Sequence, residues 1–140
     1  MKILFFNEDV PLPEFPKSKT TKWISNCIEE YGFIVGNINF IFVSDEYLLK
    51  MNQEYLNHDY FTDVITFDYC EGKTIKGDVF ISVPRINENA QTFNQKFTDE
   101  LFRVMIHGIL HLIGYHDKTN EEKKQMRSKE NAALEKLKKL

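Results

Sequence analysis

Residues 104–117 read Val-Met-Ile-His-Gly-Ile-Leu-His-Leu-Ile-Gly-Tyr-His-Asp. From 104 to 113 the side chains are apolar apart from two histidines and one glycine, so a helix here has no polar face to turn toward water. Residues four apart on an α-helix are separated by about 40° around its axis, so His107 and His111 share one face. The stretch therefore predicts a buried central helix whose two imidazoles can reach one metal ion.

Gly114 ends this apolar run. A glycine just past a helix end can take the left-handed conformation and turn the chain back on itself. That turn would bring residue 116 or 117 beside the imidazoles, and both His116 and Asp117 can bind a metal. The metzincin pattern His-Glu-x-x-His-x-x-Gly-x-x-His places its third ligand three residues after the glycine, which favours Asp117. We expect a metal centre of His107, His111 and Asp117 with an open position for water.

The residue after the first histidine limits the chemistry of this centre. Metalloproteases carry a glutamate there as general base, whereas this chain has Gly108. No carboxylate stands between His107 and His111. The motif therefore indicates a metal-dependent hydrolase other than a peptidase of that mechanism.

Around the central helix the sequence predicts further helices and strands. Gly72 lies in a turn between two segments rich in β-branched and aromatic residues, which predicts a hairpin, and residues 119–122 form a capping box for a final helix. The fold class is α+β: a single domain over residues 1–140, with a mixed sheet of about four strands packed against helices. Strands are expected at 1–6, 38–43, 63–69 and 74–83, and helices at 20–31, 45–56, 85–93, 98–113 and 120–140.

Composition excludes several classes of protein. At 140 residues with 42% hydrophobic side chains, the chain can build one packed core, which excludes a disordered protein. The apolar run is shorter than the ~20 residues that a membrane span needs, and the start of the chain does not resemble a secretion signal. Cys27 and Cys70 are too few for a disulfide scaffold, so we expect reduced thiols in a cytoplasmic protein. The net charge of −3 does not by itself indicate a nucleic-acid partner, although the last segment is mildly basic.

The histidine motif resembles that of the YbeY family of bacterial endoribonucleases, His-Gly-x-Leu-His-Leu-x-Gly-Tyr-Asp-His, with the last two residues in reversed order. A second family block, Asn-x-x-Tyr-Arg-x-x-Asp-x-Pro-Thr-Asp-Val-Leu-Ser-Phe, resembles residues 52–67, and residues 77–82 are also similar. Two departures concern function. Asp117 stands where the family has its third ligand, a histidine, and Leu56 stands where the family has an arginine suited to hold a phosphate.

This resemblance implies one zinc ion on the three-ligand motif and cleavage of single-stranded RNA. It further implies ribosomal RNA processing, notably maturation of the small-subunit rRNA 3′ end, and ribosome quality control. The partners would be single-stranded or ribosomal RNA and the ribosome or its proteins, with no membrane involved. Two alternatives stay open: a non-catalytic, metal-stabilised ribosome-assembly factor, and a metallohydrolase of another substrate class.

Four residues outside the ligand set are candidates for the remaining roles. His116 and His58 could move protons, because imidazole titrates near neutral pH. Arg103, Lys118 or His58 could take over the positioning of substrate that Leu56 cannot provide. Asp63, at the start of an expected strand, is interpreted as a backbone cap.

Overall fold

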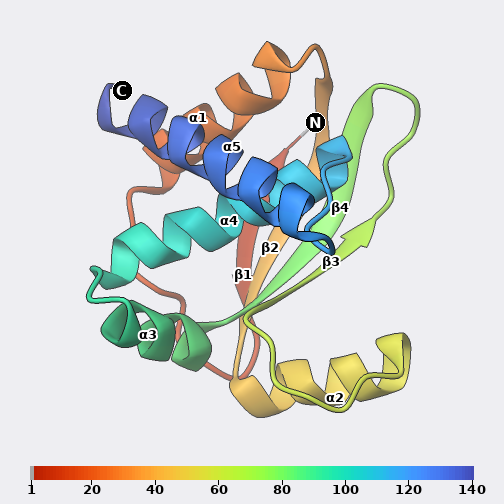
Figure 1. Cartoon of the computed structure of the whole chain (residues 1–140), viewed down its shortest axis with the longest axis vertical. Helices are drawn as coiled ribbons and strands as arrows, with labels where there is room; N and C mark the ends of the chain where they lie inside the picture. The colour runs from red at the N-terminus through yellow and green to blue at the C-terminus, as the bar shows by residue number, and fades with distance from the viewer. Residues whose placement is uncertain (1) are drawn as a thin grey trace.

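The computed structural model describes residues 2–140, which form a four-stranded sheet and five helices (Figure 1). The strands are β1 (Ile3–Asn7), β2 (Ile34–Val43), β3 (Val64–Asp68) and β4 (Thr74–Ser82). The helices are α1 (Lys17–Glu30), α2 (Asp45–Leu56), α3 (Val83–Thr92), α4 (Phe97–Ile113) and α5 (Asn120–Lys138).

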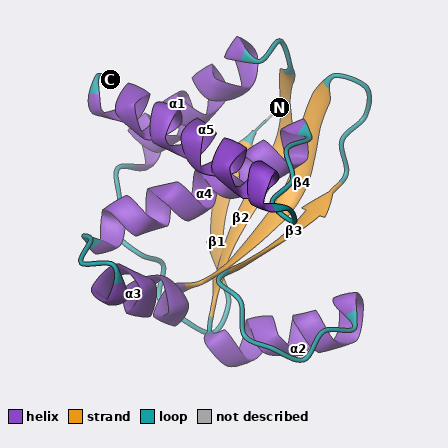
Figure 2. Ribbon diagram, in the orientation of Figure 1, coloured by secondary structure: helices purple, strands orange, loops and turns teal. Residues whose placement is uncertain are grey.

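The sheet has the order β1-β2-β4-β3 and is mixed. β1 pairs with β2 and β2 with β4 in parallel, whereas β3 and β4 form the expected antiparallel hairpin. The prediction of an α+β fold with a mixed four-stranded sheet is confirmed (Figure 2).

The two faces of the sheet are covered differently. Because side chains alternate along a strand, Ile38, Phe40 and Phe42 of β2 point to the face covered by α1 and α4, on which α5 packs in turn. Ile41 and Val43 point to the other face, where Leu48 of α2 joins them in a smaller cluster. In Figure 1, α2 lies at one end of the sheet, apart from α1, α4 and α5.

The central helix α4 is buried as its composition predicts. Leu101, Met105 and Ile109 are fully shielded from solvent. α1 and α5, which both contact α4, are joined by a buried hydrogen bond of 2.8 Å from Trp23 Nε1 to the Ala133 carbonyl. Burial on several sides fixes the rotation of α4 about its own axis, and with it the direction in which its histidines point.

Several predicted boundaries were wrong. The first helix begins at Lys17, three residues before Thr20, because Pro16 is tolerated at a helix N-cap and does not extend the loop. The second strand begins at Ile34, since a register shift between Val35 and Ile38 absorbs the intervening glycine. The first strand runs to Asn7, and Met1, which the prediction included, lies outside the described residues.

No helix within residues 2–140 combines the length and the apolar character that crossing a bilayer requires.

Candidate metal centre

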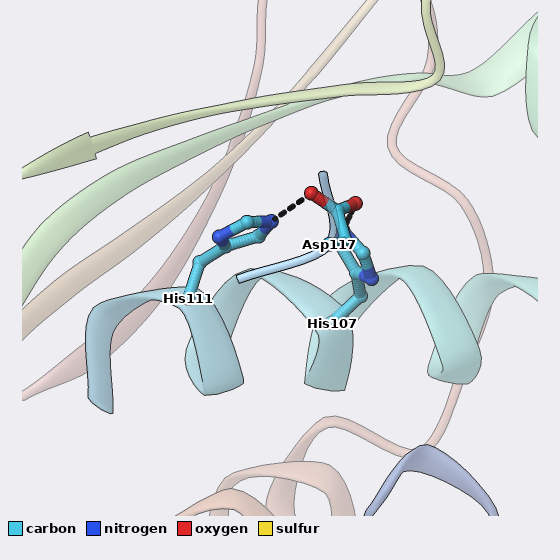
Figure 3. Close-up of side chains that lie close together, drawn as sticks. All are labelled: His107, His111 and Asp117. Atoms are coloured by element: carbon cyan, nitrogen blue, oxygen red, sulfur yellow. Dashed lines mark ion pairs between the residues drawn. The ribbon is translucent and has the colours of Figure 1, made fainter. Parts of the chain in front are cut away.

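His107 and His111 project from the same face of α4, as their spacing predicts. Their ring centroids are 4.7 Å apart with an interplanar angle of 74°. Figure 3 shows both rings rising from one side of the helix toward a third residue, Asp117. Both imidazoles are partly buried, so their polar atoms point into a restricted space.

Gly114 produces the chain reversal that brings this third residue back. Its φ of 122° lies in a region that side-chain-bearing residues rarely adopt. The amide of Gly114 donates to the carbonyls of Leu110 and His111, and that of Tyr115 donates to Leu110 at 3.0 Å, so the helix end is closed. Asp117 then lies beside the imidazoles only a few residues after α4 has ended.

The Asp117 carboxylate lies between the two rings. Its Oδ2 is 3.3 Å from His107 Nε2 and its Oδ1 is 3.5 Å from His111 Nε2. Within residues 2–140, these three form the group of histidine, cysteine and carboxylate donors close enough to hold one ion, with atoms within 4.8 Å of one another. Two ligands held ~2.0–2.1 Å from one tetrahedral ion lie about 3.3 Å apart, so the two histidine–Asp117 distances match a metal ion of the zinc type.

A second carboxylate orients His107 from the opposite side of the ring. His107 Nδ1 donates to Glu130 Oε2 at 2.7 Å, and Arg103 Nη1 donates to the other oxygen, Oε1, at 2.9 Å. Glu130 is 5% exposed. When the ring is neutral with its proton on Nδ1, Nε2 is the lone-pair atom that faces Asp117.

The local electrostatics shift the two histidines in opposite directions. Burial raises the pKa of Glu130, but the hydrogen bonds from His107 and Arg103 outweigh it, and the net pKa lies below the ordinary value. Burial lowers the pKa of His107, but its bond to Glu130 raises it above the ordinary value, so a metal ion has to displace the proton from Nε2 to bind there. At His111, burial and the charge of His107 both lower the pKa, which favours a neutral ring able to act as a ligand.

Gly108 is required by packing. A Cβ at this position would lie 2.9 Å from Val79 Cγ1 and 3.4 Å from Thr66 Oγ1, which are side chains of the sheet. The face of α4 that bears Gly108 is pressed against β3 and β4, so the glutamate of the metalloprotease motif has no room there.

The donor group lines a cavity of about 550 Å³. One wall comes from α4 and the turn after it, with His107, His111, His116, Asp117 and Lys118. The other comes from β3, from Leu56 at the end of α2, and from His58 and Tyr60 in the segment between α2 and β3.

The predicted residues therefore fall into two groups. His116 and His58 line the cavity of about 550 Å³, whereas Arg103 lines an adjoining cavity of about 360 Å³ that His107 and Asp117 also border. Asp63, interpreted as a backbone cap, borders both cavities, and its Oδ2 accepts from Asn89 Nδ2 at 3.4 Å.

Sequence reasoning missed Glu130. A signal was present in the sequence, because Glu130 falls in register with Met126, Ala133 and Leu137 on the buried side of the last helix. A charged residue on an apolar helix face requires a partner. The sequence could not show that the partners are His107 and Arg103.

Fold and donor set together define a class: an α+β protein with two histidines and one carboxylate grouped as a candidate mononuclear metal centre on a buried helix. The family model described as "Endoribonuclease YbeY" matches residues 6–138. The chain belongs to the YbeY family, as its motifs predict.

Relatives and a solved structure agree with this assignment. A protein of Bacteroides thetaiotaomicron named Endoribonuclease YbeY is 48% identical over 134 residues, which cover 96% of this chain and 98% of the relative. One of Porphyromonas gingivalis with the same name is 48% identical over 133 residues, covering 95% and 88%. A solution structure from Thermotoga maritima matches with a TM-score of 0.67 at 28% identity, covering 97% of this chain and 89% of the other.

Proposed function

We propose that this chain is a zinc-dependent endoribonuclease that hydrolyses single-stranded RNA. The observation that carries the proposal is the grouping of His107, His111 and Asp117 in the wall of an open cavity. Two imidazoles and one carboxylate that leave a position open form a catalytic type of zinc set. The relatives named endoribonucleases supply the substrate class.

In this proposal each residue has a definite task. A zinc ion on the three donors would polarise a water molecule and offset charge on the scissile phosphate. Glu130 holds the His107 ring in place, and Arg103 acts as a positioning residue because it contacts Glu130. His116 and His58 line the cavity and can accept or return a proton, and Lys118 brings a positive charge to the same cavity.

The cellular role that we propose is ribosomal RNA processing, including maturation of the small-subunit rRNA 3′ end, together with ribosome quality control. This role requires ribosomal RNA and the ribosome or its proteins as partners and places the protein in the cytoplasm. It is supported by family membership and by two cysteines that form no disulfide.

Metal analysis combined with an RNA cleavage assay tests the proposal. The purified protein should contain one zinc per chain and cut a single-stranded RNA, and a chelator should abolish cutting. His111→Ala and Asp117→Ala should lose zinc and activity together, whereas His116→Ala should keep zinc and lose activity in part. Zinc retained in Asp117→Ala and lost in His116→Ala would contradict the ligand assignment.

The same assay separates the two alternatives. A protein that holds zinc, cuts no RNA and is still needed for ribosome assembly in cells would be a non-catalytic assembly factor. Cleavage of casein in place of RNA would indicate another class of metallohydrolase.

A further inference from the structure

The segment between α2 and β3 carries exposed aromatic rings at the candidate metal centre. In the family block an arginine stands at the position of Leu56, and here Leu56 lines the cavity without any charge. Two residues further along, His58 stacks on Tyr60, with ring centroids 5.1 Å apart and an interplanar angle of 21°. Both rings line the cavity that contains His107, His111 and Asp117.

A buried residue of α2 bonds the backbone of both residues of this ring pair. Asn52 is 2% exposed. Its side-chain Nδ2 donates to the Tyr60 carbonyl at 2.9 Å, and its backbone carbonyl accepts from the His58 amide at 3.0 Å. A further hydrogen bond of 3.0 Å joins Tyr60 Oη to His58 Nδ1. One buried residue thus fixes both ends of the stack, so the rings are positioned before any ligand arrives.

The pair is also open to solvent. Tyr60 is 55% exposed, and His58 is exposed as well. Two nearly parallel rings with centroids 5.1 Å apart shield part of one face of each other, which leaves the outer faces for a third flat group. Aromatic side chains and histidine are the groups on which proteins stack unpaired RNA bases.

We infer that the His58–Tyr60 pair is a base-stacking platform that receives an unpaired nucleobase of the strand next to the scissile phosphate. The inference rests on the proposed function and deepens it, because a base paired in a duplex has both faces covered by its neighbours and cannot reach the platform. Selectivity for single strands then comes from stacking on this chain's own rings. Stacking takes over part of the substrate binding that Leu56 cannot supply by charge.

Binding of two strands tests the platform directly. One is a fluorescently labelled single-stranded RNA of about ten nucleotides, and the other has the same length and charge but abasic sugars throughout. Both carry phosphorothioate linkages to resist hydrolysis, and fluorescence anisotropy is recorded with the protein as purified. We expect the base-bearing strand to bind about tenfold more tightly than the abasic strand, which is the size of one stacked base.

Variants separate stacking from a structural role. Tyr60→Ala should remove most of the tenfold difference by weakening only the base-bearing strand, and the salt dependence of binding should not change, because stacking releases no counterions. Tyr60→Phe keeps the ring and should bind like the parent. Tyr69→Ala is the matched control, since Tyr69 is 54% exposed but lines a different cavity, on the α2 side of the sheet.

The outcomes that overturn the inference are distinct from failure of the proposed activity. Equal weakening of both strands in Tyr60→Ala would show a structural role, and no weakening, or the same effect in Tyr69→Ala, would show that bases do not stack there. If the protein cuts no RNA but Tyr60→Ala still loses base-dependent binding, the platform stands and the catalytic proposal falls. If cleavage is normal and Tyr60→Ala binds like the parent, only the platform falls.

Discussion

The two walls of the candidate centre are built in contrasting ways. The wall formed by α4 and the turn after it holds its polar atoms through buried charge: Glu130 is bonded on one side to His107 and on the other to Arg103. The wall formed by the α2–β3 segment contains no such ion pair among its described residues. It is held by two hydrogen bonds of the buried Asn52, one from its side-chain amide and one to its backbone carbonyl, and exposes its rings.

The difference follows from what each wall is proposed to bind. A metal ion requires ligand atoms fixed within a few tenths of an ångström, and a desolvated carboxylate–imidazole pair provides that rigidity. A nucleobase needs a flat surface that water can leave, which exposed aromatic rings provide. If this contrast holds, metal binding and base binding can be altered independently of each other.

The largest effect is expected from removing a ligand of the α4 wall. In the parent protein, zinc at about a thousand times its dissociation constant should raise the free energy of unfolding by about 4 kcal/mol. His107→Ala should abolish this zinc-dependent stabilisation, because one donor of the group is lost. Thermal unfolding with and without zinc measures it, with Tyr69→Ala as the control that keeps the full response. If zinc stabilised His107→Ala as much as it stabilises the parent, His107 would not be a zinc ligand.

The next effect concerns the partner of His107. Glu130→Gln should weaken zinc binding roughly 10- to 100-fold, since the amide cannot hold the imidazole as a carboxylate does. Competition with a chromogenic chelator measures the affinity. Glu135→Gln, an exposed residue of the same helix paired with Lys138, should leave the affinity unchanged. Base-dependent strand binding should persist in Glu130→Gln, and its loss would show that the two walls are coupled.

A smaller effect is expected at the opposite wall. Asn52→Ala should lower the free energy of unfolding by about 1–3 kcal/mol, because the amide that supports Tyr60 is removed. It should also reduce base-dependent strand binding while zinc content stays at one per chain. Denaturant unfolding and metal analysis on the same sample measure both. Loss of zinc in a folded Asn52→Ala protein would refute the independence of the walls.

The smallest effect should come from introducing at position 56 the arginine that the family block has there. Leu56→Arg places a guanidinium at the cavity, where it can contact one phosphate. Strand binding should tighten a few-fold at low salt, and the slope of log affinity against log salt should steepen by about 0.7. Leu56→Gln, which is polar but uncharged, should leave the slope as it is. An unchanged slope in Leu56→Arg would mean that no phosphate passes this position.

Much of the α4 wall was accessible to prediction because its geometry is local. The spacing of His107 and His111 on one helix and the glycine at 114 are enough to expect a third ligand beside the pair. The spacing also favoured Asp117 over His116, and the structure brings Asp117 between the rings. The boundary errors at Lys17 and Ile34 have local causes as well, since a proline at a helix start and a glycine in a strand both resemble loop signals.

What the sequence indicated by itself was therefore the central helix, its histidine pair with a third donor after Gly114, and the family, each of which is read from short motifs of neighbouring residues. The tertiary structure decided how those donors are held and what faces them. Glu130 reaches His107 from the last helix, and His58 and Tyr60 meet the same cavity from the segment before β3. Helical periodicity and turn chemistry act over a few residues, whereas these contacts exist only once α4, α5 and the sheet have packed together.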